Sequence, residues 1–263
     1  MIRTMRKTNA ALLTAALAVA LLGIPRISFA AQAAGAQDSQ ATDSAAAAKL
    51  NKSQFKDVKV TVDNGIATLT GTVALYEYKA DAGKRVLKAK GVTAERNMIE
   101  VAGPNIPDRE LESKLQERLS YDRVGYGNVF NAIGVKVENG VATVGGHART
   151  DVDKDSALAL VSTTPGVKDV IGEIEVDPVS IMDDQTRMAV ARAIYGYPSL
   201  TKYSIDPVKP IRISVQNGNV ELYGMVDTQG DKEIAYMRAN GVPGIFSVKN
   251  YLQVANQPSE AKK

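Results

Sequence analysis

Residues 137–146 read VENGVATVGG, in which two short alternating apolar and polar runs flank Asn139-Gly140. Such runs on either side of Asn-Gly predict a β-hairpin with a tight primed turn. The same signal recurs at Asn64-Gly65 and Asn217-Gly218, followed at identical spacings by three marker residues. Self-similarity of this kind indicates repeated supersecondary units. The markers are a glycine in the second strand, a second glycine and a valine: Gly71, Gly91 and Val101; Gly146, Gly166 and Val176; Gly224, Gly244 and Val254.

A helix and a final strand are predicted after each hairpin. In the first copy, Ala82 and Val86 are four residues apart, which puts them on one helix face, and Gly91 is expected to end the helix. The strand from Ile99 to Val101 should then pair in parallel with the second hairpin strand, because a helix connects the two. The glycine inside that second strand indicates a bend or a close approach of another element.

A further helix is predicted before each hairpin. Asp108 is expected to cap this helix in the second copy and Asp184 in the third. In the first copy, residues 44–50 are mostly alanine and too few for three turns. The predicted fold is therefore α+β: three tandem small αββαβ domains, each a mixed three-stranded sheet with two helices packed on one face, with a shortened first helix in the first copy.

Residues 1–30 are predicted to be a secretory signal peptide. A basic start precedes an apolar run from Ala10 to Ile24, and Ser28 and Ala30 supply small residues for cleavage near Ala30, with Ala33 as the alternative. The apolar run is shorter than the ~20 residues that a membrane-spanning helix needs. We therefore expect export to the periplasm. The remainder divides into a disordered lead-in (31–43), three domains (44–105, 106–177 and 178–254) and a polar tail (255–263).

Charge and cysteine content narrow the function classes. The full chain has a net charge of +3, but residues 1–30 carry four basic residues and no acids, which leaves 28 basic and 29 acidic residues in the rest. Overall charge therefore gives no support for nucleic-acid binding. The chain has no cysteine, so each domain must be held together by its apolar core without disulfides.

The repeated pattern resembles the BON domain of bacterial envelope proteins. The resemblance is carried by VENGVATVGG and TPGVKDV in the second copy and by VQNGNVELYGMV and NGVPGIFSVKNYLQV in the third, and it covers about residues 44–254. It implies a protein similar to osmotically inducible and envelope-stress proteins of the periplasm, in a family held to bind phospholipid surfaces or other envelope components. The family has no common catalytic residue to carry over.

Catalytic chemistry finds little support in the residues. His147 is the only histidine, and beside a turn-like glycine pair we expect it to face solvent rather than act as a base. A cluster of acids around it in the folded protein would revive the enzyme hypothesis. Asp151, Asp153 and Asp155 lack the glycine and glutamate of a calcium loop and are better explained as a helix N-terminus. We expect no catalytic site, no metal, no cofactor, no nucleic-acid partner and no small-molecule substrate.

The candidate contact residues are basic and aromatic. The first domain has a net charge of +4, the second −5 and the third +1. A basic helix face in the first domain could meet anionic lipid, or be a solvated surface, or dock on the acidic second domain. Tyrosines before the hairpin of the third domain could lie at a lipid–water interface or cap a small core. The candidate lipid- or partner-binding residues are Lys79, Lys84, Arg85, Lys88, Tyr195 and Tyr197.

Three functions remain open on these observations. The leading hypothesis is a non-enzymatic periplasmic protein that contacts the phospholipid membrane surface in osmotic or envelope stress. The alternatives are a chaperone-like binder of unfolded envelope proteins, which would need an exposed apolar patch, or a scaffold that binds envelope proteins or the cell wall. A hydrolase or metal-dependent enzyme is disfavoured because no nucleophile–base set is evident.

Overall fold

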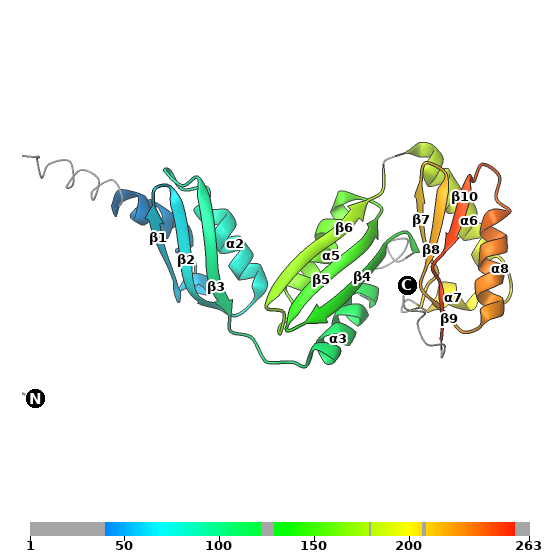
Figure 1. Cartoon of the computed structure of the whole chain (residues 1–263), viewed down its shortest axis with the longest axis horizontal. Coiled ribbons are helices and arrows are strands. Elements are labelled where there is room, and N and C mark those ends of the chain that lie inside the picture. The colour runs from blue at the N-terminus through cyan, green and yellow to red at the C-terminus, as the bar shows by residue number, and fades with distance from the viewer. Residues whose placement is uncertain (1–39, 122–128, 179, 207–208, 256–263) are drawn as a thin grey trace, which may run out of the picture. The chain divides into compact units, whose positions relative to one another are not determined.

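A computed structural model describes residues 40–121, 129–178, 180–206 and 209–255. Each of the three repeats forms a three-stranded mixed sheet with helices on one face (Figure 1), as the sequence predicts. Repeat 1 contains a helix at residues 40–47, η1 (Ala48–Leu50), η2 (Ser53–Phe55), β1 (Val58–Asp63), β2 (Ile66–Val73), α2 (Tyr76–Val86) and β3 (Ala94–Val101). Repeat 2 contains α3 (Asp108–Tyr121), β4 (Ala132–Glu138), β5 (Val141–Ala148), α5 (Asp151–Ser162) and β6 (Asp169–Val176).

Repeat 3 has the same order, with one short additional helix and interrupted strands. It contains α6 (Ile181–Tyr195), α7 (Lys202–Ile205), β7 (Arg212–Gln216), β8 (Asn219–Tyr223), β9 (Met225–Val226), α8 (Gln229–Asn240), β10 (Ser247–Asn250) and β11 (Gln253–Val254). The interruption in the second strand falls at Gly224, the strand glycine of this repeat. In all three repeats the first two strands are antiparallel and the third pairs in parallel with the second, which confirms the predicted topology.

The hairpin turns have the conformation that Asn-Gly favours. All three asparagines have φ between 50° and 55°, and the glycines that follow them have φ between 75° and 79°. Two successive residues with positive φ are typical of a type I′ turn, whose twist matches that of the flanking strands. The predicted hairpins are therefore confirmed in each repeat.

The strand glycines occupy positions where no side chain fits. Gly146 has φ +108°, and a Cβ atom there would lie 2.0 Å from the carbonyl oxygen of Ala132 on the neighbouring strand. Gly71 and Gly224 have the same kind of φ and meet backbone carbonyls at 2.0 and 2.6 Å. Close backbone approach explains why the glycine recurs in register three times.

Each repeat has its own apolar core between its sheet and its helices. The predicted helix-face residues are fully buried, among them Ala82 and Val86 in repeat 1 and Ala157 and Val161 in repeat 2. Phe130, from the segment just before β4, packs into the core of repeat 3. The second and third repeats therefore share apolar packing as well as polar contacts.

The predicted helix caps are wrong in both copies. The Asp108 carboxylate accepts hydrogen bonds from the backbone N–H groups of Asn139 and Gly140, at 2.6 and 2.8 Å, so it holds the hairpin turn and not its own helix. In repeat 3, Asp183 does the same for its turn, and Ser180 is the N-cap that accepts from the Asp183 N–H. These aspartates bind the turn because the folded chain places the hairpin turn beside the start of the helix. Local sequence spacing does not reveal that contact.

A side chain from the first helix satisfies the outer edge of the first strand in every repeat. The Asp43 carboxylate accepts from the N–H of Val62, and the Glu112 carboxylate accepts from the N–H of Val137. At the equivalent position in repeat 3, Arg187 donates to the backbone carbonyl of Val215. Pairing these edge groups within the repeat protects part of the strand from adding to another chain.

The opening helix of repeat 1 begins earlier than residue 44. Residues 40–43 are helical, although the sequence predicts a disordered lead-in there, and the helix continues to residue 47 before η1. Ala46 and Leu50 of this segment are buried in the core of repeat 1. The helix is still shorter than α3 and α6, as expected.

Candidate functional site

Two of the four predicted basic contact residues are engaged within the protein. The Lys79 ammonium lies 3.8 Å from the Asp169 carboxylate of repeat 2. Arg85 donates to Asp81 at 2.7 Å, and its guanidinium lies 5.8 Å from the centroid of the Phe55 ring. Both side chains are partly buried, so they present less charge to an external surface than the sequence suggests.

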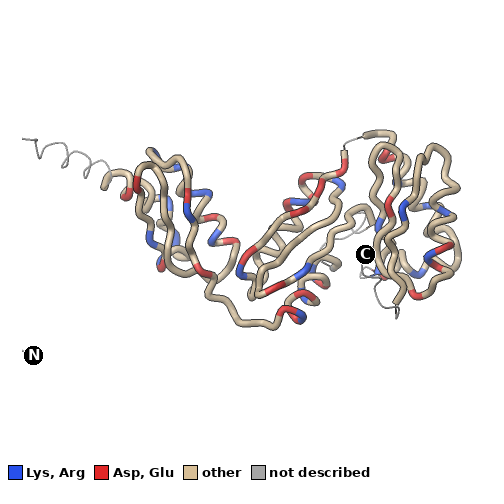
Figure 2. The backbone as a smooth tube through the Cα atoms, in the orientation of Figure 1, with Lys and Arg blue, Asp and Glu red and all other residues tan. Residues whose placement is uncertain are grey.

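The end of α2 retains an exposed basic and apolar surface, which we call the α2 tip: Lys84, Leu87, Lys88 and Lys90. All three lysines are exposed, and none forms an ion pair with any residue that the structure describes. Leu87 is 42% exposed between them. Figure 2 shows that both signs of charge are interspersed on each repeat, so the α2 tip is a local feature and not part of a wholly basic face.

The two predicted tyrosines differ in their surroundings. The Tyr195 hydroxyl donates to the carbonyl of Ile211 at 2.6 Å, and burial raises the pKa of this phenol. Tyr195 is thus a structural residue that completes the core of repeat 3. Tyr197 is partly exposed, with the Arg238 guanidinium 5.6 Å from its ring centroid.

Repeat 3 carries an exposed apolar cluster that sequence reasoning missed. Ile181 and Met182 are 78% and 71% exposed, and Phe246 is 82% exposed. Met182 and Phe246 line one open cavity of about 830 Å³ between the start of α6 and the loop before β10. Nothing in the sequence distinguishes these side chains from core residues, because apolar residues near a helix start and after a helix-end glycine are ordinary packing positions.

His147 is not solvent-facing, which corrects the sequence-based expectation. It lies on the open face of its sheet, where contact with repeat 3 leaves the side chain 17% exposed. Its Nδ1 atom lies 3.1 Å from the Gln216 amide and 3.5 Å from the Asp177 carboxylate, and its Nε2 atom lies 3.7 Å from Glu221. The hydrogen bond with Asp177 raises the pKa of His147, and the charges of Asp177 and nearby glutamates act in the same direction.

Acids therefore surround the histidine, which is the observation that would revive the enzyme hypothesis. Asp177, however, is fully buried and also binds Arg187, at 3.0 Å, and the Ser214 hydroxyl, at 3.1 Å. Ser214 donates to Asp177 and not to His147, so the histidine is not placed to activate a serine nucleophile. Although burial alone would raise the pKa of Asp177, hydrogen bonds from His147 and Gln216 and the Arg187 charge lower it. The cluster fits an ion-pair network that fastens repeat 2 to repeat 3.

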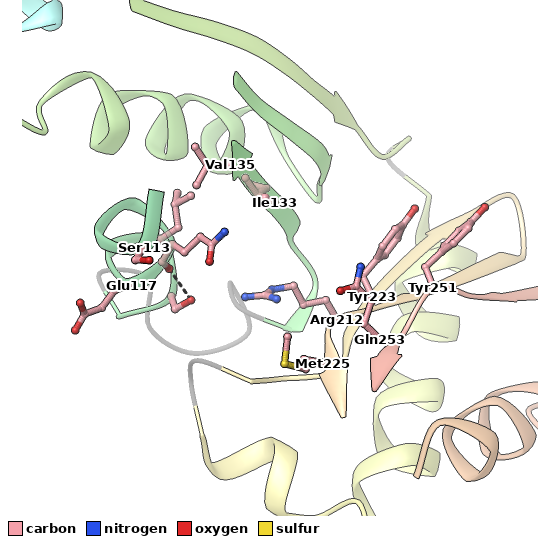
Figure 3. A pocket seen from close by; sticks show the side chains of 14 residues that line it. Ser113, Glu117, Ile133, Val135, Arg212, Tyr223, Met225, Tyr251 and Gln253 are labelled. Carbon is pink, nitrogen blue, oxygen red and sulfur yellow. Dashed lines mark hydrogen bonds between the residues drawn. The ribbon is translucent and has the colours of Figure 1, made fainter. Parts of the chain in front are cut away.

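A cavity of about 630 Å³ opens beside this network (Figure 3). One wall is formed by α3 and β4, with Ser113, Glu117, Ile133 and Val135. The other wall belongs to repeat 3, and Arg212 points from β7 toward α3 and β4. The sequence gives no signal for this cavity, because its two walls come from residues 113–135 and 212–253, which are far apart along the chain. Its remaining lining residues include Tyr223, Met225, Tyr251 and Gln253.

None of the helices in the described ranges combines the length and apolar character that crossing a bilayer requires. Within the same ranges, no group of three or more histidine, aspartate or glutamate side chains is arranged to hold a metal ion.

Three proteins provide comparisons at the level of the whole chain. Osmotically-inducible protein Y of Escherichia coli (strain K12) is 24% identical over 198 residues, which cover 70% of this chain and 91% of that protein. Among solved structures, the C-terminal domain of CdsD, the structural protein of the type III secretion system of Chlamydia trachomatis, is 18% identical, covering 77% of this chain and 92% of that chain with a TM-score of 0.24. The periplasmic domain of the type III secretion inner membrane protein PrgH from S. typhimurium is 10% identical, covering 79% and 97%, with a TM-score of 0.17. The two structural likenesses are too low to bear on function.

The family is shown by the repeats themselves. The sequence profile of the BON domain matches residues 38–103, 107–178 and 183–256. Each match includes the hairpin, the second helix and the final parallel strand, together with all or most of the opening helix. With three tandem matches over most of its length, this chain belongs to the BON domain family.

Proposed function

We propose that this protein is a non-enzymatic periplasmic protein that binds anionic phospholipid surfaces in osmotic or envelope stress. The signal-peptide features of residues 1–30 and the relative named for osmotic induction support the compartment and the setting. The observation that carries the lipid assignment is the α2 tip, where three exposed lysines without acidic partners among the described residues surround the partly exposed Leu87.

The composition of the α2 tip suits an anionic bilayer. A lysine near such a surface contributes about 1 kcal/mol, so three of them contribute about 3 kcal/mol, or more than a hundredfold in partition. Leu87 adds an apolar side chain that can enter the interface, and the lysine stems can lie along it while the ammonium groups stay at the headgroups. The binding should weaken as salt rises, because screening shortens the range of the attraction.

Vesicle flotation tests this proposal with a matched control. The protein without residues 1–30 is mixed with phosphatidylglycerol-containing vesicles at low and high salt. The test variant changes Lys84, Lys88 and Lys90 to alanine. The control variant makes the same charge change at three exposed lysines, one in each repeat, that form no ion pair with a described residue: Lys59, Lys114 and Lys209.

The expected result is salt-sensitive flotation that the test variant loses and the control variant keeps. Equal losses in the two variants would mean that only net charge matters, which would contradict a site at the α2 tip. Absence of flotation at any salt would refute the lipid proposal and favour an envelope protein or the cell wall as partner.

The apolar cluster of repeat 3 favours a second candidate, a chaperone-like binder of unfolded envelope proteins. Ile181, Met182 and Phe246 supply the exposed apolar surface that this function needs. The test is suppression of aggregation of a denatured outer-membrane protein on dilution. Changing Met182 and Phe246 to serine should abolish suppression if the cluster binds unfolded chains, and unchanged suppression would exclude it.

A further inference from the structure

The outer edge of β4 carries backbone groups that have no hydrogen-bond partner among the residues that the structure describes. The Val137 N–H bonds to Glu112 and so points away from β5. In an antiparallel pair, alternate residues direct both backbone groups to the same side, so Val135 and Ile133 also point outward. Neither residue's backbone N–H or carbonyl on this edge has a hydrogen-bond partner within the described ranges. Such an edge is a template for another strand.

Other backbone groups on the outer edges of the first strands are hydrogen-bonded by side chains, unlike those of Ile133 and Val135. In repeat 2 the Glu112 carboxylate covers only the end of the edge nearest the turn. In repeat 3 the equivalent edge is covered at both ends, by Arg187 at Val215 and by Tyr195 at Ile211. Ile133 and Val135 instead line the 630 Å³ cavity, opposite Arg212. A helix, α3, and the open strand edge thus flank a groove.

Arg212 supplies an uncompensated cation in this groove. It is partly buried and forms no ion pair or hydrogen bond with a residue in the described part of the chain. Its guanidinium reaches into the space between β7 and β4 (Figure 3). Burial lowers the pKa of Arg212, which agrees with a charge that has lost water without gaining an acid. A planar guanidinium in this state is suited to a bidentate carboxylate.

The repeat 3 wall beyond Arg212 is suited to apolar side chains. The Tyr223 and Tyr251 rings stack with centroids 5.1 Å apart, and Met225 is partly exposed beside them. A volume of about 630 Å³ lies within the usual range of ligand sites. Strand edge, cation and apolar wall together match one chemical class, an extended peptide that carries a carboxylate.

We propose that this groove binds an extended peptide, which adds as a strand to the open edge of β4 at Ile133 and Val135 and places a carboxylate at Arg212. The backbone groups of these two residues supply the pairing hydrogen bonds, and the carboxylate at Arg212 supplies the charge recognition. The carboxylate comes either from the peptide C-terminus or from an acidic side chain. The site is separate from the α2 tip, so it can hold whether or not the protein binds lipid.

Fluorescence anisotropy with defined probes tests the proposal on the protein without residues 1–30. The first probe is a fluorescein-labelled hexapeptide of alternating valine and threonine that ends in phenylalanine with a free carboxylate. The second is its C-terminal amide, and the third is the amide with glutamate in place of the final threonine. Binding of the first probe but not the third assigns the C-terminal carboxylate, and the reverse assigns a side-chain carboxylate.

Two variants separate the charge contact from the strand contact. Arg212→Gln should weaken the preferred probe about tenfold or more and remove its advantage over the plain amide. Val135→Pro removes one outward N–H, a change that edge strands tolerate, and should weaken every probe. Val60→Pro makes the same change at the equivalent edge position of repeat 1 and should alter nothing.

Hydrogen exchange of the unmodified protein supplies a readout that needs no variant. The bound peptide should slow exchange in fragments that cover β4 and leave β1 unchanged. The proposal is overturned if no probe binds saturably up to about 1 mM, if Arg212→Gln binds the acid and amide probes as the original protein does, or if Val135→Pro leaves binding intact. Failure of exchange to slow in β4 would also overturn it.

Discussion

Replacing Gly146 with alanine tests whether backbone geometry requires the strand glycine of each repeat. Gly146 has φ +108°, and its added Cβ atom would lie 2.0 Å from the backbone oxygen of Ala132. Its neighbour Gly145 lies outside the positive-φ region, and a Cβ atom there would meet the Glu173 side chain at an ordinary 3.7 Å. Gly145→Ala is therefore a matched control only one residue away.

The two substitutions should differ by several kcal/mol. Holding a residue with a side chain at such a φ costs about 1–3 kcal/mol. Relief of the contact with a backbone oxygen also requires β4 and β5 to separate locally, which loses hydrogen bonds at about 1 kcal/mol each. We expect Gly146→Ala to lower the free energy of unfolding of repeat 2 by about 3 kcal/mol or more. Gly145→Ala should change it by less than about 1 kcal/mol, since it also lowers the entropy of the unfolded chain.

Hydrogen exchange measured by mass spectrometry resolves the repeats and so suits this comparison. A loss of about 3 kcal/mol speeds exchange through opening by more than a hundredfold in fragments that cover β4 and β5. Fragments from the core of repeat 1 should be unaffected, because that repeat has a core of its own. Equal exchange rates in the Gly146→Ala and Gly145→Ala proteins would refute the geometric reasoning.

Further predictions concern the network between repeats 2 and 3 and the core of repeat 3. Asp177→Ala should destabilise this junction by about 3–5 kcal/mol, because the buried Arg187 loses its buried partner and keeps only the more exposed Asp184. The control Asp184→Ala removes that more exposed carboxylate while Asp177 still pairs with Arg187, so it should cost less than about 1 kcal/mol in urea unfolding. Folding raises the pKa of His147 above its ordinary value of 6.5. The stability that comes from protonating His147 is therefore fully present below pH 6.5 and is lost as the pH rises through the pKa of the folded protein. An NMR titration of this histidine should give a midpoint above 6.5. Folding lowers the pKa of Asp177, so its contribution is present above 3.8 and lost as pH falls through the folded value, which acid unfolding of the Asp177→Asn protein checks. Tyr195→Phe should cost about 1–3 kcal/mol by leaving the buried carbonyl before β7 unpaired, without changing vesicle flotation; weaker flotation would contradict its structural role.

The parts of the fold that depend on local chemistry could be predicted from the sequence. Asn-Gly pairs specify type I′ turns at Asn64, Asn139 and Asn217 because few other residue pairs accept two positive φ angles. The third strand is expected to be parallel to the second because a helix connects them, and a helical crossover returns the chain to the end of the sheet where the second strand began. Repetition of the pattern three times strengthened each of these predictions.

Features that depend on contacts between distant segments could not be predicted. Asp108 and Asp183 hold hairpin turns that lie more than 30 residues further along the chain. Helix-cap spacing instead predicts caps at Asp108 and Asp184. The position of His147 on the open sheet face is visible from strand alternation, but its burial comes from repeat 3. Arg212 and the free edge of β4 have no sequence signature at all, because the groove exists only where two repeats meet.

The candidate lipid site also combines a feature that the sequence predicts with features that depend on the folded structure. The sequence shows that the helix at α2 is basic. Only the structure separates Lys79 and Arg85, which form ion pairs, from Lys84 and Lys88, which have no acidic partner among the described residues. Leu87 and Lys90, just beyond the helix, then join the surface because they are exposed beside these lysines. Whether this surface meets lipid remains a proposal that the membrane experiments decide.

The most direct test of the lipid proposal places an environment-sensitive fluorophore on a single cysteine at position 87. The natural chain contains no cysteine, so Leu87→Cys creates a unique attachment point, and Thr70→Cys on the open sheet face of repeat 1 is the control. With phosphatidylglycerol vesicles, we predict a blue shift and quenching by a lipid-attached quencher at position 87 and neither change at position 70. A probe that stays in water at position 87 while the protein floats with the vesicles would contradict the account.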